Sequence, residues 1–237
     1  MKCLENPIWN DYTREELKKL KVDEPDELYR KKVLKNWDAI AKPLDGMGKF
    51  ETLIAKIGAI TGTEEIDITK KAVVIMCADN GIVEEGVSQS GQEVTVAVAK
   101  AMGKGQSCVG QMAKAVGADT IPVDIGINLK ETIHGFVSRK IRCGTRNFSK
   151  EPAMLEAEAI QAIATGIEMA FLCKKAGYKI LATGELGIGN TTTSSAVAAA
   201  LLKCEVPKVT GRGAGLNDIG LDILTEEANA WYDQYCK

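Results

Sequence analysis

The sequence has one histidine, His134, among 237 residues, and none of its seven cysteines forms a Cys-x-x-Cys pair. Structural zinc sites are built from paired cysteines and histidines, so no metal site is expected. A Ser-His-Asp triad would have to use His134, but this residue stands in a polar stretch that favours a hydrogen-bonded surface histidine. The odd number of cysteines and their mostly apolar neighbours indicate reduced packing residues.

Long apolar runs and a strong net charge are also missing. No run reaches the length of a membrane span, and residues 1–10 show no apolar core of a signal peptide. The net charge of −2 gives no reason to expect a nucleic acid or a membrane as a partner. We therefore expect a cytoplasmic protein. With 45% hydrophobic residues, the chain can bury the core of one large domain.

The expected fold is organised around residues 179–196. Ile180–Ala182 is an apolar run typical of a short buried strand, and three glycines then allow a sharp turn between Gly184 and Gly189. A strong helix former follows at Ala196–Leu202. A glycine-rich turn that opens a helix directs backbone N–H groups at an anion, most often a phosphate.

Two alternatives qualify this interpretation of the turn. No lysine follows the glycines and the third glycine of a dinucleotide fingerprint is missing, so an ordinary strand-to-helix turn is equally compatible with the glycines alone. Glu185 shifts the balance toward a site, because a carboxylate beside an anion cradle suits a positive or N–H-bearing ring. The pattern thus favours a site for both a phosphate and such a ring.

Residues 1–70 are predicted to form a small helical subdomain that packs on the main domain. Thr13 and Glu16 form a capping-box pattern that starts a short helix reaching Lys21, and Asp26–Ala41 is a second helix. Apolar residues spaced on one helical face are expected to be buried: Leu28, Val33, Leu34, Trp37 and Ile40 in the second helix, and Phe50, Leu53, Ile54 and Ile57 in a third.

After residue 70, strands alternate with helices. The expected strands are Lys71–Asp79, Thr120–Gly126, the run before the central turn, and Val206–Thr210. The expected helices are Val94–Met102, Gln106–Val116, Pro152–Lys175 with Ile160, Ile163, Ile167 and Phe171 on one face, the helix after the central turn, and Leu221–Gln234. This order predicts an α/β fold with a parallel sheet and right-handed crossovers.

Three acidic residues follow apolar strands directly: Asp79, Asp124 and Glu185. In open α/β sheets, ligands bind at the carboxyl ends of the strands, so we expect all three at one edge of the sheet. For Asp79 and for Ser90 in the next loop, a ligand site and a solvated loop are equally supported.

Other charged groups are interpreted as solvated. Glu84 and Glu85 stand in a loop that is expected to face water. Residues 128–150 are polar and irregular, and their basic cluster is expected to be a solvated face; it consists of Arg139, Lys140, Arg142 and Arg146.

Several segments together resemble one family and occur in the right order over most of the chain. They are Lys42–Leu53, Cys77–Gly81, Glu85–Ser88, Val123–Gly126, Pro152–Met154, Gly184–Thr192 and Gly211–Gly213. The chain resembles nicotinate-nucleotide:dimethylbenzimidazole phosphoribosyltransferases, the enzymes of the lower ligand of cobamides. The resemblance implies a Rossmann-like parallel sheet flanked by helices, a homodimer, and no metal or other cofactor.

The resemblance also implies the reaction and its residues. The phosphoribosyl group of nicotinate mononucleotide would pass to dimethylbenzimidazole or a related base, giving alpha-ribazole phosphate and nicotinate. The turn Gly187–Thr192 would hold the phosphate, with Gly213. Glu185 would be the catalytic residue near the ribose. The base would meet Asp79 and Ser90. The predicted phosphate-binding residues are Gly187, Ile188, Gly189, Asn190, Thr191 and Gly213.

The chain departs from the family pattern in some places. Residues 71–237 match a phosphoribosyltransferase domain that is incomplete at its C-terminal end, and the glycine-rich segment that carries the family's catalytic glutamate is not found. Asn80 replaces the usual histidine, Val98 replaces a glutamine, and a lysine is missing near Leu221–Leu224. An active enzyme and an impaired homologue that serves as a nucleotide- or base-binding protein or partner subunit both stay open.

Overall fold

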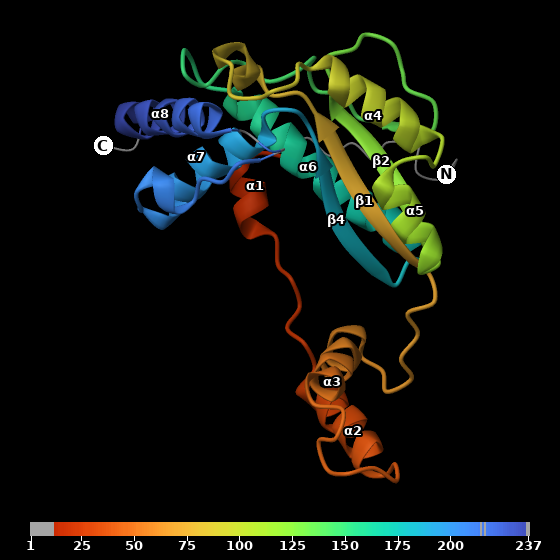
Figure 1. Ribbon diagram of the computed structural model, residues 1–237. Helices are drawn as coiled ribbons and strands as arrows, with labels where there is room; N and C mark the ends of the chain where they lie inside the picture. Colours follow the sequence, from red (N-terminus) through yellow and green to blue (C-terminus); the bar gives the residue numbers. More distant parts are fainter. Residues whose placement is uncertain (1–11, 214, 216, 236–237) are drawn as a thin grey trace. The chain divides into compact units, whose positions relative to one another are not determined.

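The computed structural model describes residues 12–213, 215 and 217–235. The chain divides into two compact units, a helical unit of Thr13–Thr69 and a larger unit that contains Lys70–Lys237 (Figure 1). The packing of the N-terminal segment on the main domain stays a prediction.

The helical unit contains α1 (Arg14–Lys19), α2 (Glu27–Asp38) and α3 (Lys49–Thr61). Thr13 and Glu16 form the predicted capping box, in which each side chain accepts the backbone N–H of the other residue. Asp26 starts α2 by accepting the N–H of Leu28 at 2.8 Å. The N-terminal helices therefore begin where the capping residues place them.

The buried face of α3 differs from the predicted one. Phe50 and Leu53 are exposed, whereas Ala55 and Ala59 are buried. A Cβ on Gly58 would lie only 2.7 Å from Cγ2 of Val33 in α2. Small residues on α3 thus let the two helices approach closely, and the larger apolar side chains point elsewhere. On α2, Leu28 and Ile40 are likewise exposed.

The larger unit is built on a four-stranded sheet with the order β3-β2-β1-β4 (Figure 1). The strands are β1 (Lys71–Ala78), β2 (Ala118–Gly126), β3 (Val137–Ser138) and β4 (Ile180–Leu186). Every pairing is parallel. The predicted α/β fold with a parallel sheet flanked by helices is confirmed.

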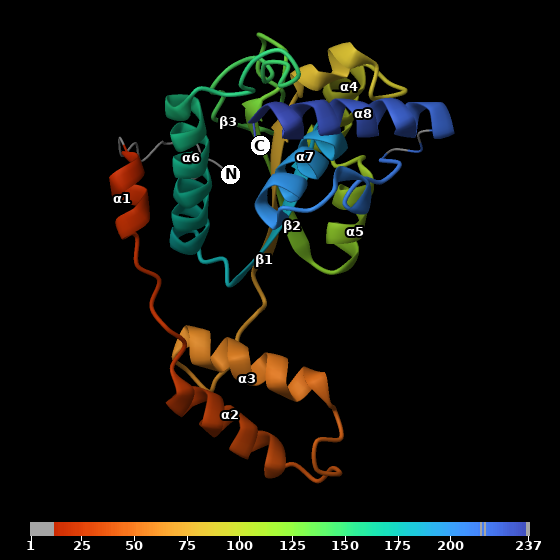
Figure 2. The same ribbon diagram turned by 90° about the vertical axis from the view of Figure 1, so that its left-hand side faces the viewer.

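Helices cover both faces of this sheet (Figure 2). On one face, Ala72 and Val74 of β1 pack with Met169 and Leu172 of α6 (Glu156–Lys175). On the other face, Ile75 and Cys77 pack with α4 (Glu93–Gly103), and α5 (Cys108–Ala115) adds Val109 to this cluster. Burial on both faces explains why β1 is apolar throughout.

The predicted apolar face of α6 is wrong. Ile163 and Phe171 are exposed, and the buried face carries Thr165 and Glu168 beside its apolar residues. Glu168 is buried because Arg139 pairs with it, through Nε to Oε2 at 3.0 Å and through a terminal nitrogen to Oε1 at 3.2 Å. Apolar spacing in the sequence does not identify this buried face, because the face contains a charged residue.

The interpretation of residues 128–150 as a solvated basic face is also wrong. Arg139 is buried after β3, and Lys140 pairs with Asp124 at 2.9 Å. Arg146 donates two hydrogen bonds to Glu158, at 2.7 and 3.2 Å, and Arg142 lies 3.7 Å from the same carboxylate. These cations form ion pairs within the larger unit, and the pairs hold the irregular segment 128–150 against β2 and α6.

The C-terminal part contains α7 (Asn190–Leu202), η3 (Val206–Lys208) and α8 (Asp218–Tyr235). The strand expected at Val206–Thr210 is wrong, because Pro207 lacks the amide donor that a central strand needs and the segment forms a 3₁₀ turn instead. Ala199, Val206 and Ala228 join these elements in one cluster. Among the described residues, no helix is both long enough and apolar enough to cross a bilayer.

Candidate functional site

The central turn connects β4 to α7, and it bends as the glycines predict. Gly189 has φ +87°, a left-handed conformation, and it immediately precedes the first residue of α7. In the described structure no side chain caps this helix. The N–H of Asn190 donates to the carbonyl of Gly187 at 3.2 Å. The N–H groups of Thr191 and Thr192 lie next to it at the positive end of the helix dipole, a position that suits a phosphate.

The glycines are required by packing inside the chain as well. A Cβ on Gly189 would lie 2.7 Å from Cγ2 of Val83 in η2 (Gly81–Glu85). A Cβ on Gly187 would collide with the carbonyl oxygen of Ala78. The turn is thus pressed against the end of β1, and a ligand would reach it from the other side.

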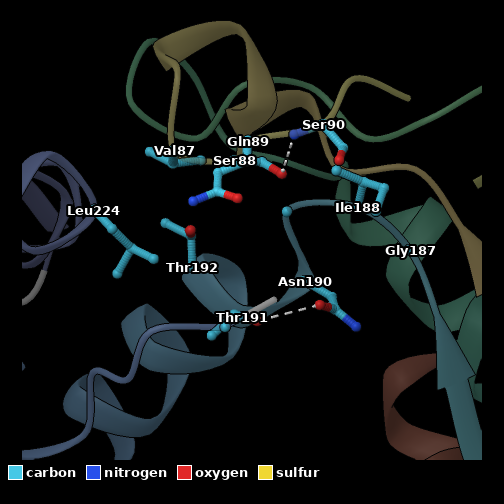
Figure 3. A pocket seen from close by; sticks show the side chains of 12 residues that line it. Val87, Ser88, Gln89, Ser90, Gly187, Ile188, Asn190, Thr191, Thr192 and Leu224 are labelled. Atoms are coloured by element: carbon cyan, nitrogen blue, oxygen red, sulfur yellow. Dashed lines mark hydrogen bonds between the residues drawn. The ribbon is translucent and has the colours of Figure 1, made fainter. Parts of the chain in front are cut away.

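A pocket opens at this turn, and Figure 3 shows the side chains around it. It combines the turn with the loop after η2 and with one residue each from the Gly211–Gly215 segment and α8. The lining residues are Val87, Ser88, Gln89, Ser90, Gly187, Ile188, Gly189, Asn190, Thr191, Thr192, Gly213 and Leu224. Seven residues of the predicted site are therefore brought together, namely Ser90, Gly187, Ile188, Gly189, Asn190, Thr191 and Gly213. Their roles in binding stay predictions.

Thr192 is the buried polar group of this pocket. Its side chain is 1% exposed, and among the described residues its hydroxyl has no hydrogen-bond partner. Figure 3 shows it projecting from α7 toward the segment of Val87 and Gln89. A buried hydroxyl without a partner in a pocket wall is suited to donate to a ligand oxygen.

Sequence reasoning does not single out Ser88 and Gln89, which also line the pocket. Ser88 Oγ accepts the backbone N–H of Ser90 at 3.2 Å, and so fixes the loop that presents Ser90 (Figure 3). The signal in the sequence is the segment ending at Ser88, which belongs to the family pattern.

Glu185 lies near the end of β4, beside the turn but outside the pocket lining. Asn190 Nδ2 donates a hydrogen bond to its Oε2. Although the residue as a whole is exposed, desolvation of its carboxyl group raises the pKa of Glu185 above its ordinary value of 4.5, and the hydrogen bond from Asn190 opposes that rise. The carboxylate is thus poised as an acceptor of protons beside the pocket.

Asp79 does not face the pocket. It is fully buried, and its Oδ2 accepts the N–H of Asn128 at 2.8 Å while its carbonyl accepts the N–H of Thr145 at 2.9 Å. Burial raises its pKa. As the chain is packed, this side chain has no surface with which to touch a base, and it holds the loops under the site instead.

The three acidic strand ends lie at one edge of the sheet, as predicted. In the register, Cys77 pairs with Asp124 and Met76 pairs with Glu185, and Asp79 follows two residues after Cys77. Asp124 is buried, accepts the N–H of Ile127 at 3.0 Å and pairs with Lys140. Only Glu185 of the three is exposed next to the pocket.

The solvated interpretation of Glu85 is wrong. It receives hydrogen bonds from Asn147 and Ser149 and pairs with Lys150 at 2.9 Å. The hydrogen bonds of Lys150 and Asn147 lower its pKa. Glu84 remains largely exposed, as expected, and also reaches Lys150. Over the residues that the structure describes, no three His, Cys, Asp or Glu side chains come close enough to hold a metal ion.

Comparison with known proteins identifies the fold and the family. The family model described as phosphoribosyltransferase (DBI_PRT) matches residues 22–226. The nicotinate-nucleotide–dimethylbenzimidazole phosphoribosyltransferase of Clostridium perfringens strain 13 is 47% identical over 181 residues, which cover 76% of this chain and 50% of the relative. That of Acetivibrio thermocellus is 44% identical over 198 residues, with 82% and 56% covered.

Two solved structures from Thermus thermophilus have the same fold. One, titled CobT, is 33% identical with a TM-score of 0.79, and the match covers 86% of this chain and 60% of that chain. The other, titled as a nicotinate-nucleotide-dimethylbenzimidazole phosphoribosyltransferase, is 31% identical with a TM-score of 0.81, covering 88% and 62%. The chain spans about half the length of the curated relatives that it matches. This chain belongs to the phosphoribosyltransferase family DBI_PRT, which its sequence segments, its sheet and its glycine-rich turn all fit.

Proposed function

We propose that the chain binds nicotinate mononucleotide and a benzimidazole-type base, and that it serves the transfer of the phosphoribosyl group between them. The observation that carries the proposal is the pocket at the start of α7, which joins the uncapped turn to Ser90 and Gly213. The names of the relatives support the choice of substrates.

In this reaction a benzimidazole nitrogen attacks C1′ of the ribose from the face opposite the nicotinate ring. The bond between C1′ and the nicotinate nitrogen breaks, and its electrons stay with the departing nicotinate. The configuration inverts through a transition state that resembles an oxocarbenium ion. The other nitrogen of the benzimidazole loses its proton, which a general base must take.

The residues divide between holding the phosphate and moving the proton. The N–H groups of Thr191 and Thr192 and the hydroxyl of Thr192 would bind the 5′-phosphate. Ser90, held by Ser88, would contact the base. Glu185, with its raised pKa, is the carboxylate beside the turn and would accept the proton or stabilise the positive charge on the ribose.

Calorimetry and turnover together test the proposal. Nicotinate mononucleotide should bind the 237-residue chain, and nicotinic acid riboside, which lacks the phosphate, should bind more weakly. Glu185→Gln should lower nicotinate release by about 10²- to 10⁴-fold while leaving nucleotide affinity nearly unchanged. Glu205→Gln, at an exposed pair with Lys208, is the matched control. No nucleotide binding would contradict the proposal, and equal turnover in Glu185→Gln would remove Glu185 from it.

A second function is supported by one specific observation. None of the pocket-lining residues in the described part of the chain carries a carboxylate. A homologue with such a pocket would bind the nucleotide or the base without transferring the phosphoribosyl group. Tight nucleotide binding without nicotinate release would identify this binding protein or partner subunit.

A homodimer and a cytoplasmic location belong to the same proposal. Exposed apolar side chains on α7, namely Val197, Leu201 and Leu202, are compatible with an interface between two copies. Cys77, Cys108, Cys143 and Cys204 carry free thiols, which is compatible with a reducing compartment. Sedimentation equilibrium would measure the oligomeric state.

A further inference from the structure

Two buried polar side chains outside the pocket lining hold the two peptide groups of Ile188. Oγ1 of Thr95, on α4 and fully buried, accepts the N–H of Ile188 at 3.1 Å. Nδ2 of Asn80, 8% exposed, donates to the carbonyl of Ile188 at 3.3 Å. The residue at the centre of the turn is therefore anchored on both sides by groups distant in sequence.

These anchors act where the backbone is otherwise free. Ile188 lies between Gly187 and Gly189, and glycine loses more conformational freedom on ordering than any other residue. Without the anchors, the two peptide groups could rotate about the glycine bonds, and the start of α7 would change direction. A binding site is more effective when such freedom is removed before the ligand arrives.

Asn80 also reaches into the helix itself. Its Oδ1 accepts the hydroxyl of Thr193 at 2.9 Å, and its backbone carbonyl accepts Nε2 of Gln92 at 3.2 Å. The end of β1, the turn and the first turn of α7 are thus tied through one side chain.

Thr95 is tied in turn to the buried carboxyl under the site. Burial raises the pKa of Asp79, and the hydroxyl of Thr95 opposes that rise. The hydroxyl that accepts the N–H of Ile188 thus also influences the pKa of Asp79.

We propose that Thr95 and Asn80 are positioning residues, which fix the peptide groups of Ile188 so that the N–H groups at the start of α7 face the phosphate of a bound nucleotide. The inference rests on the proposed function. In this role the two residues do not touch the nucleotide. They increase only the part of its affinity that depends on the phosphate.

The test compares Thr95→Val, which keeps the shape and removes the hydroxyl, with Thr95→Ser, which keeps the hydroxyl. Thr95→Val should weaken binding of nicotinate mononucleotide by roughly 3- to 10-fold, the range expected for one lost hydrogen bond. Binding of nicotinic acid riboside should stay within about twofold in both variants, and Thr95→Ser should bind the nucleotide nearly as the wild type does. Amide exchange at Ile188 should become faster in Thr95→Val alone.

Asn80→Asp is the second variant, in case Thr95→Val does not fold. It keeps the acceptor for Thr193 and places a carboxylate against the carbonyl of Ile188, so it should also weaken nucleotide binding selectively.

The outcomes separate this inference from the proposed function. Wild-type nucleotide affinity in both Thr95→Val and Asn80→Asp, or an equal loss for nucleotide and riboside, would overturn it. If the wild-type chain binds no nucleotide, the proposed function fails. Amide exchange at Ile188 then still tests whether Thr95 positions the turn. Faster exchange in Thr95→Val supports the positioning role, and unchanged exchange overturns it.

Discussion

Gly189 shows at the scale of one residue how the turn is specified. Its φ of +87° and the short distance from a Cβ to Val83 both exclude a side chain. Gly189→Ala should therefore lower the free energy of unfolding by about 1–3 kcal/mol and weaken nucleotide binding. Gly166→Ala is the control, because that glycine lies inside α6 with open space around it and should gain up to about 1 kcal/mol. Urea denaturation measures both, and equal effects would contradict the argument.

The raised pKa of Glu185 predicts a pH dependence of stability. The folded pKa lies above 4.5, so the folded chain holds this proton more tightly than the unfolded chain does. The contribution of Glu185 to stability is therefore lost as the pH rises through the window between these two values. Glu185→Gln removes the titration, so its stability relative to the wild type should be higher at pH 7 than at pH 4. Urea denaturation at both pH values checks this, and a constant difference would contradict it.

Single residues also show what the sequence could predict about the site. Gly187, Gly189 and Asn190 follow one another in the chain, so their shared position at a helix start could be inferred locally. The burial of Asp79 could not be inferred in this way, because the groups that bind its Oδ2 and its backbone carbonyl come from Asn128 and Thr145, far along the chain. Local motifs predict which residues meet, whereas burial depends on the whole packing.

At the scale of elements, β1 was predictable because a strand buried on both faces is apolar nearly throughout, and β2 because it contains the buried apolar run Ile121–Val123. The run Ile180–Ala182 of β4 was expected to be buried, but Leu181 and Ala182 are exposed because β4 lies at the edge of the sheet. A local sequence pattern does not determine the order of the strands, so it does not reveal which strand lies at the edge. The face of α6 that packs on the sheet could likewise not be predicted, because a charged pair occupies that face.

That pair on α6 gives a prediction about stability. Arg139 and Glu168 are both buried, with side chains 4% and 6% exposed. Arg139→Met should destabilise the fold by about 3–5 kcal/mol, because it leaves the Glu168 charge buried without this guanidinium. Arg139→Met combined with Glu168→Leu should recover part of the loss. Lys208→Ala, which removes an exposed pair, should cost at most about 1 kcal/mol. Equal losses in chemical denaturation would contradict the role of burial.

A carboxylate at the start of α6 predicts how the stability of the fold changes at acidic pH. Two hydrogen bonds from Arg146, joined by the N–H of Leu155, lower the pKa of Glu158 to about 2. The stability that this carboxylate contributes is present above its ordinary value of 4.5 and is lost as the pH falls toward 2. Glu158→Gln should therefore be less stable than the wild type at pH 6, and the difference should shrink on acidification. A difference that stays constant between pH 6 and pH 3 would contradict this.

At the scale of the whole molecule, the pocket is built within one compact unit. Its lining comes from the loop after η2, the turn before α7, Gly213 and α8, all of which belong to the larger unit. The lining supplies hydroxyls, two side-chain amides and backbone N–H groups, and the carboxylate of Glu185 stands beside it at the end of β4.

This division between binding and proton transfer predicts how the chain compares with a relative. The 237-residue chain should bind nicotinate mononucleotide within about tenfold of the Clostridium perfringens protein, since the phosphate turn is intact. Its turnover with dimethylbenzimidazole should be lower by about 100-fold or more, because the described pocket lining holds no carboxylate and Glu185, the proposed proton acceptor, stands beside that lining. Calorimetry and nicotinate release measure the two quantities on both proteins. Equal turnover would overturn the expectation, and its loss in Glu185→Gln would then assign the base to Glu185.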